Sequence, residues 1–213
     1  MSEGQVAALL LWLVLLAFSL NASLLRTLHA NPLYQHLCLG SAIVLVPLWT
    51  LRAGLHEGLE IHFLGLTSLT LLLGWRLALL APCLTLLILG AFGVTDLAEF
   101  GWQALIGIAL PVATSWLLFL GSWAWLPRHL FVYLFVAAFL GGALSISVKI
   151  LASALLMGMS GAYPWHTIGA DYLSIWPLLL FPEALLNGMA MTLLAVYRPH
   201  WVNTFFDREY LGR

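Results

Sequence analysis

The sequence predicts an all-α polytopic membrane protein, a bundle of seven transmembrane helices that forms one integral membrane domain over residues 1–213. Of its 213 residues, 62% are hydrophobic and only 8% are charged. A soluble domain of this size cannot hide that much apolar surface, so the lipid bilayer is its expected surrounding. The net charge of −1, without any basic run, argues against a nucleic-acid partner.

The expected spans are the apolar stretches that short polar connections separate. We place them at about residues 6–25, 33–51, 59–74, 75–93, 102–125, 130–159 and 173–197, with a polar tail at 198–213. The first stretch is expected to be a span rather than a signal peptide, because Glu3 stands where basic residues are typical of a signal peptide. Met1 is therefore expected to stay in the mature chain.

The length of the apolar stretch decides whether the third and fourth spans are two helices or one. Residues 59–94 contain no polar loop, but 36 residues of helix would be roughly 54 Å long, against a hydrocarbon core of about 30 Å. Gly74, Trp75 and Arg76 supply a flexible residue, an interfacial ring and a charge at the midpoint. We therefore expect a tight hairpin there.

The arginines predict an N-terminus outside and a cytoplasmic C-terminus. In this orientation only Arg52 lies on the outer side, whereas six arginines lie on the inner side, as the positive-inside rule favours. The inner set is Arg26, Arg76, Arg128, Arg198, Arg208 and Arg213. The same orientation gathers acids and histidines outside, where they would attract cations and offer nitrogen ligands. These outer residues are His56, Glu57, Glu60, His62, Asp96, Glu99, His166 and Asp171.

Glu60 and His62 open the third predicted helix and form the first candidate site. Imidazole nitrogens suit nickel, cobalt, zinc and copper, and carboxylates can bind the metal or orient the imidazole. Residues two apart on a helix face different directions, so His62 is expected to face the bundle and Glu60 the aqueous mouth. The alternative is a histidine hydrogen-bonded between helices.

The other outer groups have simpler interpretations that are favoured. His56 and Glu57 precede the helix in a turn, where a solvated loop is expected. Asp96 or Thr95 is expected to cap a short helix, with Glu99 near its N-terminus and with metal binding as the alternative.

Lys149 and Glu183 are titratable groups inside predicted spans, where an unpaired charge is costly. Each lies ten residues, about 15 Å, from the outer end of its helix. Equal depth on consecutive antiparallel helices predicts an ion pair that fixes helix register. The alternative makes Glu183 a ligand or a proton carrier.

Several patterns bear on packing and on the class of function. Gly141 and Gly142, and Gly101 with Gly107, predict close helix contacts. The two cysteines, at positions 38 and 83, are expected to be core residues.

The sequence carries no hydrolase, Walker or zinc-protease pattern, and no organic cofactor is evident. Any ATP hydrolysis would then belong to a separate subunit; an intramembrane enzyme would need Glu183 and His62 to converge.

The order of the motifs resembles the CbiM/NikM-type substrate-capture components of energy-coupling factor transporters for cobalt and nickel. The resemblance covers about residues 1–200. It rests on His62-Phe63-Leu64-Gly65, Gly74-Trp75-Arg76-Leu77-Ala78, the region 93–104, and Pro182-Glu183-Ala184-Leu185-Leu186.

The resemblance implies a subunit of the bacterial cytoplasmic (inner) membrane that binds a divalent metal as substrate and works with an ATPase and a coupling membrane subunit. It implies metal ligands at the N-terminal amine of Met1, at a histidine in position two and at His62. Position two is Ser2 here, so this site is incomplete. His166, Glu60 or Asp96 then substitutes, the metal differs, or the chain is an accessory or assembly subunit without the site.

Overall fold

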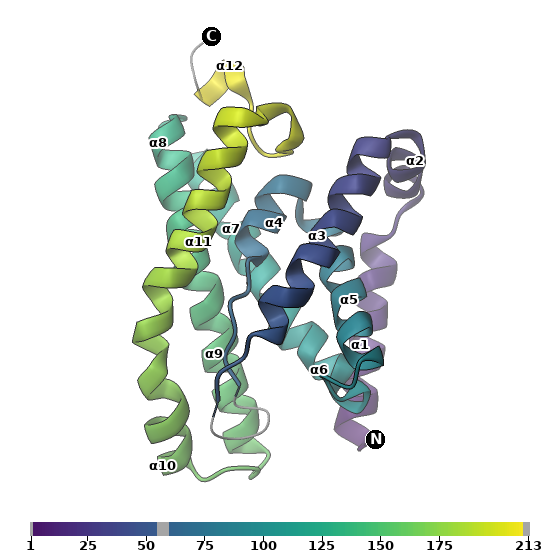
Figure 1. Ribbon diagram of the computed structural model, residues 1–213, viewed down its shortest axis with the longest axis vertical. Coiled ribbons are helices and arrows are strands. Elements are labelled where there is room, and N and C mark those ends of the chain that lie inside the picture. The colour runs from purple at the N-terminus through teal and green to yellow at the C-terminus, as the bar shows by residue number, and fades with distance from the viewer. Residues whose placement is uncertain (1, 55–59, 211–213) are drawn as a thin grey trace.

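The computed structural model describes residues 2–54 and 60–210, and the described chain is helical, with one isolated antiparallel bridge between Ala53 and Ile61. The helices lie side by side, and the two termini lie at opposite ends of the bundle (Figure 1). Many large apolar side chains are exposed, as expected where lipid is the solvent. Within residues 2–54 and 60–210, four helices are long and apolar enough to cross a membrane, or five if one bent pair forms a single span.

The N-terminal helices follow the predicted spans only in part. Helix α1 covers Glu3–Ser19, and α2 covers Ala22–Ala30. The axis of the second is turned by 72° from that of the first. Asn21 explains the break, because its side-chain oxygen accepts from the backbone N–H of Leu24 at 2.9 Å and so starts a new helix. The predicted span 6–25 is therefore not one continuous helix.

Helix α3 covers Pro32–Thr50, within one residue of the prediction. Its start is well defined: Asn31 caps the Leu33 N–H at 3.1 Å, and Pro32 occupies the first helical position.

The predicted helix 59–74 is wrong over its described first half. Residues 60–65 run without helix, and only Leu66–Leu73 form α4. Eight residues make about 12 Å of helix, well short of the hydrocarbon core of about 30 Å. Seven of these eight residues are buried. This short helix therefore lies at the centre of the bundle, among α3, α5, α7, α9 and α11.

Helix α5 covers Trp75–Ala91 and follows α4 through the predicted hairpin. Gly74 makes that turn with a φ of 79°, which favours glycine. The C-terminal tail covers the turn: the Asn203 N–H donates to the Leu72 carbonyl at 2.9 Å, and the Thr204 hydroxyl donates to the Leu71 carbonyl at 2.8 Å. The expected polar tail is thus folded onto the end of α4.

Three long helices complete the bundle, at Leu97–Trp125, Leu130–Met159 and Trp165–Tyr197. The second matches its prediction, and the other two begin earlier than predicted. Their component segments are η1 (Leu97–Glu99), α6 (Phe100–Ala104), η2 (Leu105–Ala109), α7 (Leu110–Trp125), α8 (Leu130–Val132), η3 (Tyr133–Leu140), α9 (Gly141–Met159), α10 (Trp165–Thr167), η4 (Ile168–Tyr172), η5 (Leu173–Ile175) and α11 (Trp176–Tyr197). The tail adds η6 (Pro199–Trp201) and α12 (Asp207–Tyr210).

Candidate functional site

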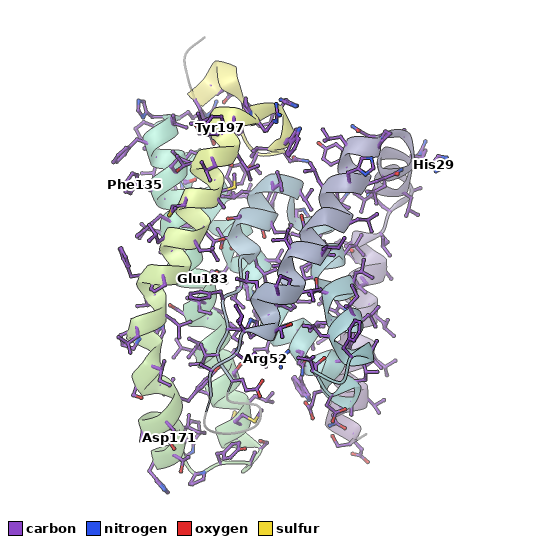
Figure 2. All side chains as sticks on the ribbon, in the orientation of Figure 1. His29, Arg52, Phe135, Asp171, Glu183 and Tyr197 are labelled. Atoms are coloured by element: carbon purple, nitrogen blue, oxygen red, sulfur yellow. The ribbon has the colours of Figure 1, made fainter. Side chains whose placement is uncertain are left out.

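A cavity of about 580 Å³ collects several of the polar groups that the sequence singles out. Three of the candidate metal ligands line it: His62, Glu60 and Asp96. Arg52, also in its wall, lies nearer than Glu183 to the end of the bundle that holds Asp171 (Figure 2). The remaining charged lining residues are Glu99 and Lys149.

The non-helical segment 60–65 forms one wall of this cavity and is held by three helices. From α3, the Trp49 indole N–H donates to the Leu64 carbonyl at 3.1 Å. From α9, the Lys149 ammonium donates to the Glu60 carbonyl at 3.2 Å. Irregular backbone at membrane depth is tolerated where protein satisfies its polar groups. The segment is therefore held in a defined conformation by the helices around it.

Helix α11 supplies the third support through Glu183. Its carboxylate accepts from the backbone N–H groups of Leu64 and Gly65, at 2.8 and 2.9 Å. Asn187, one turn later, donates to the same carboxylate at 2.8 Å and accepts from the Ser68 N–H at 2.8 Å. A carboxylate at a helix N-terminus is favourable because the helix dipole is positive there. Glu183 thus fixes the start of α4 and the end of the segment that carries His62.

The predicted Lys149–Glu183 ion pair is wrong. Glu183 is fully buried against Leu64, Gly65 and Asn187, whereas Lys149 donates to the Glu60 carbonyl. Figure 2 shows Glu183 about halfway along the long helix Trp165–Tyr197. The prediction used depth along the helices alone, and depth does not say which face of a helix a residue occupies.

His62 is oriented for binding through one ring nitrogen. Its Nδ1 lies 3.0 Å from the Phe63 carbonyl oxygen, to which it donates in the neutral tautomer that carries the proton on Nδ1. That tautomer leaves the Nε2 lone pair available as a metal ligand. The ring packs against Trp49, with 5.4 Å between centroids. His62 can therefore contribute one fixed nitrogen.

The charges around His62 have both signs. Arg52 pairs with Glu60 at 2.9 Å, and the buried Lys149 lies next to that pair. Asp96 accepts from the Ala98 N–H at 2.8 Å, which confirms its predicted capping role, and Glu99 accepts from the Gln5 side-chain amide at 2.5 Å. Among the described residues, no group of three or more histidine, cysteine or acidic side chains could hold a metal ion.

The remaining candidates that the structure describes are not part of the cavity. His166 is exposed in α10 and does not line the cavity. Ser2 caps α1: its hydroxyl accepts from the Gln5 N–H at 3.3 Å. Met1, His56 and Glu57 lie outside the described residues.

Sequence reasoning missed the residues that shape and support this site. Trp49 and Trp102 were not singled out as lining residues, and Asn187 was not singled out as a partner of Glu183. One signal was present, because Glu183 and Asn187 are four residues apart and so share a helix face.

Comparison with known families gives a match over almost the whole chain. The profile of the family CbiM, described as "Cobalt uptake substrate-specific transmembrane region", matches residues 2–201. No curated protein and no solved structure matches the chain.

Proposed function

The chain belongs to the CbiM family of cobalt uptake substrate-specific transmembrane regions, and we propose that its cavity captures the metal for uptake. The family makes it a multi-pass membrane component of cobalt uptake with a transition metal as substrate. We propose Co²⁺ or Ni²⁺ as that metal, taken from the side of the bundle where α1 begins. In this proposal the energy comes from separate ATPase and coupling membrane subunits of an energy-coupling factor transporter.

The observation that carries the proposal is the placement of His62. It is a nitrogen donor in a cavity, on a segment held by α3, α9 and α11. Two carboxylates of the same cavity, Asp96 and Glu99, lie in the turn that precedes α6, where they attract cations. Fixed ligand geometry of this kind favours metal binding over a merely structural histidine.

Substitution of His62 tests the proposal. We expect His62→Ala to weaken Co²⁺ binding by at least about tenfold, because the loss of even an outer-shell partner typically causes this much. Equilibrium dialysis of purified protein with radioactive or mass-detected Co²⁺ measures the change. His166→Ala is the matched control, since His166 is an exposed histidine away from the cavity. Equal binding by both variants and the wild type would refute the proposed role of the cavity.

We propose that the chain passes the membrane seven times, with the N-terminus outside and the C-terminus in the cytoplasm of a bacterial cell. Opposite ends for the two termini support an odd number of passes (Figure 1). Segment 60–65 with α4 would complete the third pass. Arg76, Arg128 and Arg198 lie over Trp75, Trp123 and Trp201, as expected at one membrane interface.

Cysteine labelling tests the orientation. In a background without the two native cysteines, we expect a membrane-impermeant maleimide to label Ser2→Cys on intact cells but His200→Cys only after lysis. Both positions are exposed, so access to the reagent depends on the side of the membrane. The reverse pattern would contradict the proposed orientation.

A second candidate is an accessory or assembly subunit of a membrane complex. It is favoured by Ser2 at the family's ligand position and by the lack of a three-ligand group among the described residues. This candidate predicts that His62→Ala changes neither metal binding nor uptake. An enzyme is not proposed, because both oxygens of the Glu183 carboxylate already accept from backbone N–H groups.

A further inference from the structure

Lys149 places a cationic group in the wall of the cavity. It is the single lysine of the sequence, and only 8% of it is exposed. An ammonium has three donors, and the acceptor that it contacts in the described part of the chain is the neutral carbonyl of Glu60. The nearby carboxylate of Glu60 is already paired with Arg52. Donor capacity and positive charge at Lys149 therefore remain for a ligand.

A bare divalent cation fits this cavity poorly. Lys149 lines it, has no carboxylate partner among the described residues, and would repel a metal bound at His62. A single ion also needs little space, whereas about 580 Å³ is within the range of pockets for small organic molecules. Trp49 and Trp102 add aromatic wall surface that a bare ion does not use.

We propose that the cavity receives its metal as an anionic complex with a small, carboxylate-bearing organic ligand. A carboxylate of the complex pairs with the Lys149 ammonium, and Nε2 of His62 fills one open coordination position of the metal. The organic ligand supplies the donors that the protein lacks, so a single histidine suffices. This inference rests on the proposed capture function and specifies its substrate class.

The charge pattern of the cavity agrees with such a bipolar ligand. Asp96 and Glu99, from the turn before α6, face the cationic metal centre of an approaching complex, whereas Lys149, from the middle of α9, receives the anionic part. Gln103 adds an amide to the lining that can hydrogen-bond a hydroxyl or carboxylate. A mixed lining of this kind discriminates against both free cations and free anions.

Binding of Co²⁺ alone and of a 1:1 Co²⁺–citrate complex tests the proposal on the full-length protein. We expect the complex, which is net negative, to bind at least about tenfold more tightly than Co²⁺, as expected for a close buried charge pair. Lys149→Met should remove this preference, so that the variant binds the complex no more tightly than Co²⁺. His62→Ala should weaken binding of both. Equal affinity of wild-type protein for the two probes would overturn the inference and leave the proposed function intact.

Amine modification provides a second readout that needs no variant. Lys149 is the only lysine, so modification by a small amine reagent at this position is measured by mass spectrometry of one peptide. Co²⁺–citrate should protect Lys149 severalfold more than Co²⁺ alone or citrate alone, because the complex uses both Lys149 and His62. Equal modification with and without the complex would overturn the inference. Failure of both probes to bind would overturn the proposed function as well.

Discussion

Replacement of Glu183 by alanine is expected to destabilise the protein by about 3 kcal/mol or more and to abolish metal capture. The substitution leaves two N–H groups, of Leu64 and Gly65, without their acceptor. Each buried unsatisfied donor costs about 1–3 kcal/mol. It also removes a negative charge from the N-terminus of α4, where the interaction of such a charge with the helix dipole contributes up to about 1 kcal/mol. Because segment 60–65 then loses its support, His62 loses its fixed position. Thermal unfolding in detergent and Co²⁺ dialysis measure the two effects.

Two further variants separate positioning from general damage to α11. Glu183→Gln keeps the size of the side chain but leaves one accepting oxygen in place of two, so we expect an intermediate loss of stability and of binding. Thr192→Ala is the matched control on the same helix, since Thr192 is exposed and its hydroxyl donates to the Gly188 carbonyl. If Glu183→Ala binds Co²⁺ like the wild type, the carboxylate does not position His62.

The parts of the fold that the sequence predicts well are those with local signals. Asn31 and Pro32 mark the start of α3, and Gly74 marks the hairpin before α5. The apolar stretch 130–159 forms one continuous helix, as expected from its length. Asp96 caps its short helix. Caps, prolines and turn glycines act within a few residues, so they can be recognised without tertiary structure.

The third predicted helix fails for a tertiary reason. Residues 61, 63 and 64 are apolar, and so short an apolar stretch is compatible with a helix or with an extended segment. Their backbone groups bond to Trp49, Lys149 and Glu183, which come from three other helices. Gly65 has a φ of 65°, a conformation that lets the chain enter α4 from an extended segment. These contacts compensate for the absent helical hydrogen bonds.

The residue types that form the candidate site were predictable from the sequence, but their arrangement in space was predictable only in part. A histidine and carboxylates on one side of the membrane indicated His62, Glu60 and Asp96, which line one cavity. Their hydrogen-bond partners were not predictable, because partners depend on the rotation of each helix about its axis. The same rotation turns Lys149 toward Glu60 and Glu183 toward α4, and so breaks the pairing that equal depth suggested.

Substitution of Gly101 by valine is expected to cost about 3 kcal/mol, near the upper end of the usual effect of overpacking. A Cβ atom at this position would overlap the backbone of α1 at Ala8 and Leu9. Backbone atoms cannot rotate away, so α1 must move from α6. Only three residues of α1 are buried, Ala8, Trp12 and Ser19, so few other contacts oppose that movement. We expect a lower unfolding temperature and faster proteolysis near the N-terminus.

Gly107 is the matched control, since both glycines were predicted to make close helix contacts and lie in the same long helix. A Cβ at Gly107 meets no atom within 4 Å. We therefore expect Gly107→Ala to stabilise the protein by about 0.5–1 kcal/mol, because alanine loses less backbone entropy in a helix than glycine. Opposite signs at the two positions would show that close approach of α1, and not small size alone, requires Gly101. Equal destabilisation by the two variants would contradict the α1–α6 packing.

Because Gln5 of α1 also bonds to Glu99 of the cavity, Gly101→Val should in addition weaken metal capture, while Gly107→Ala leaves that bond in place.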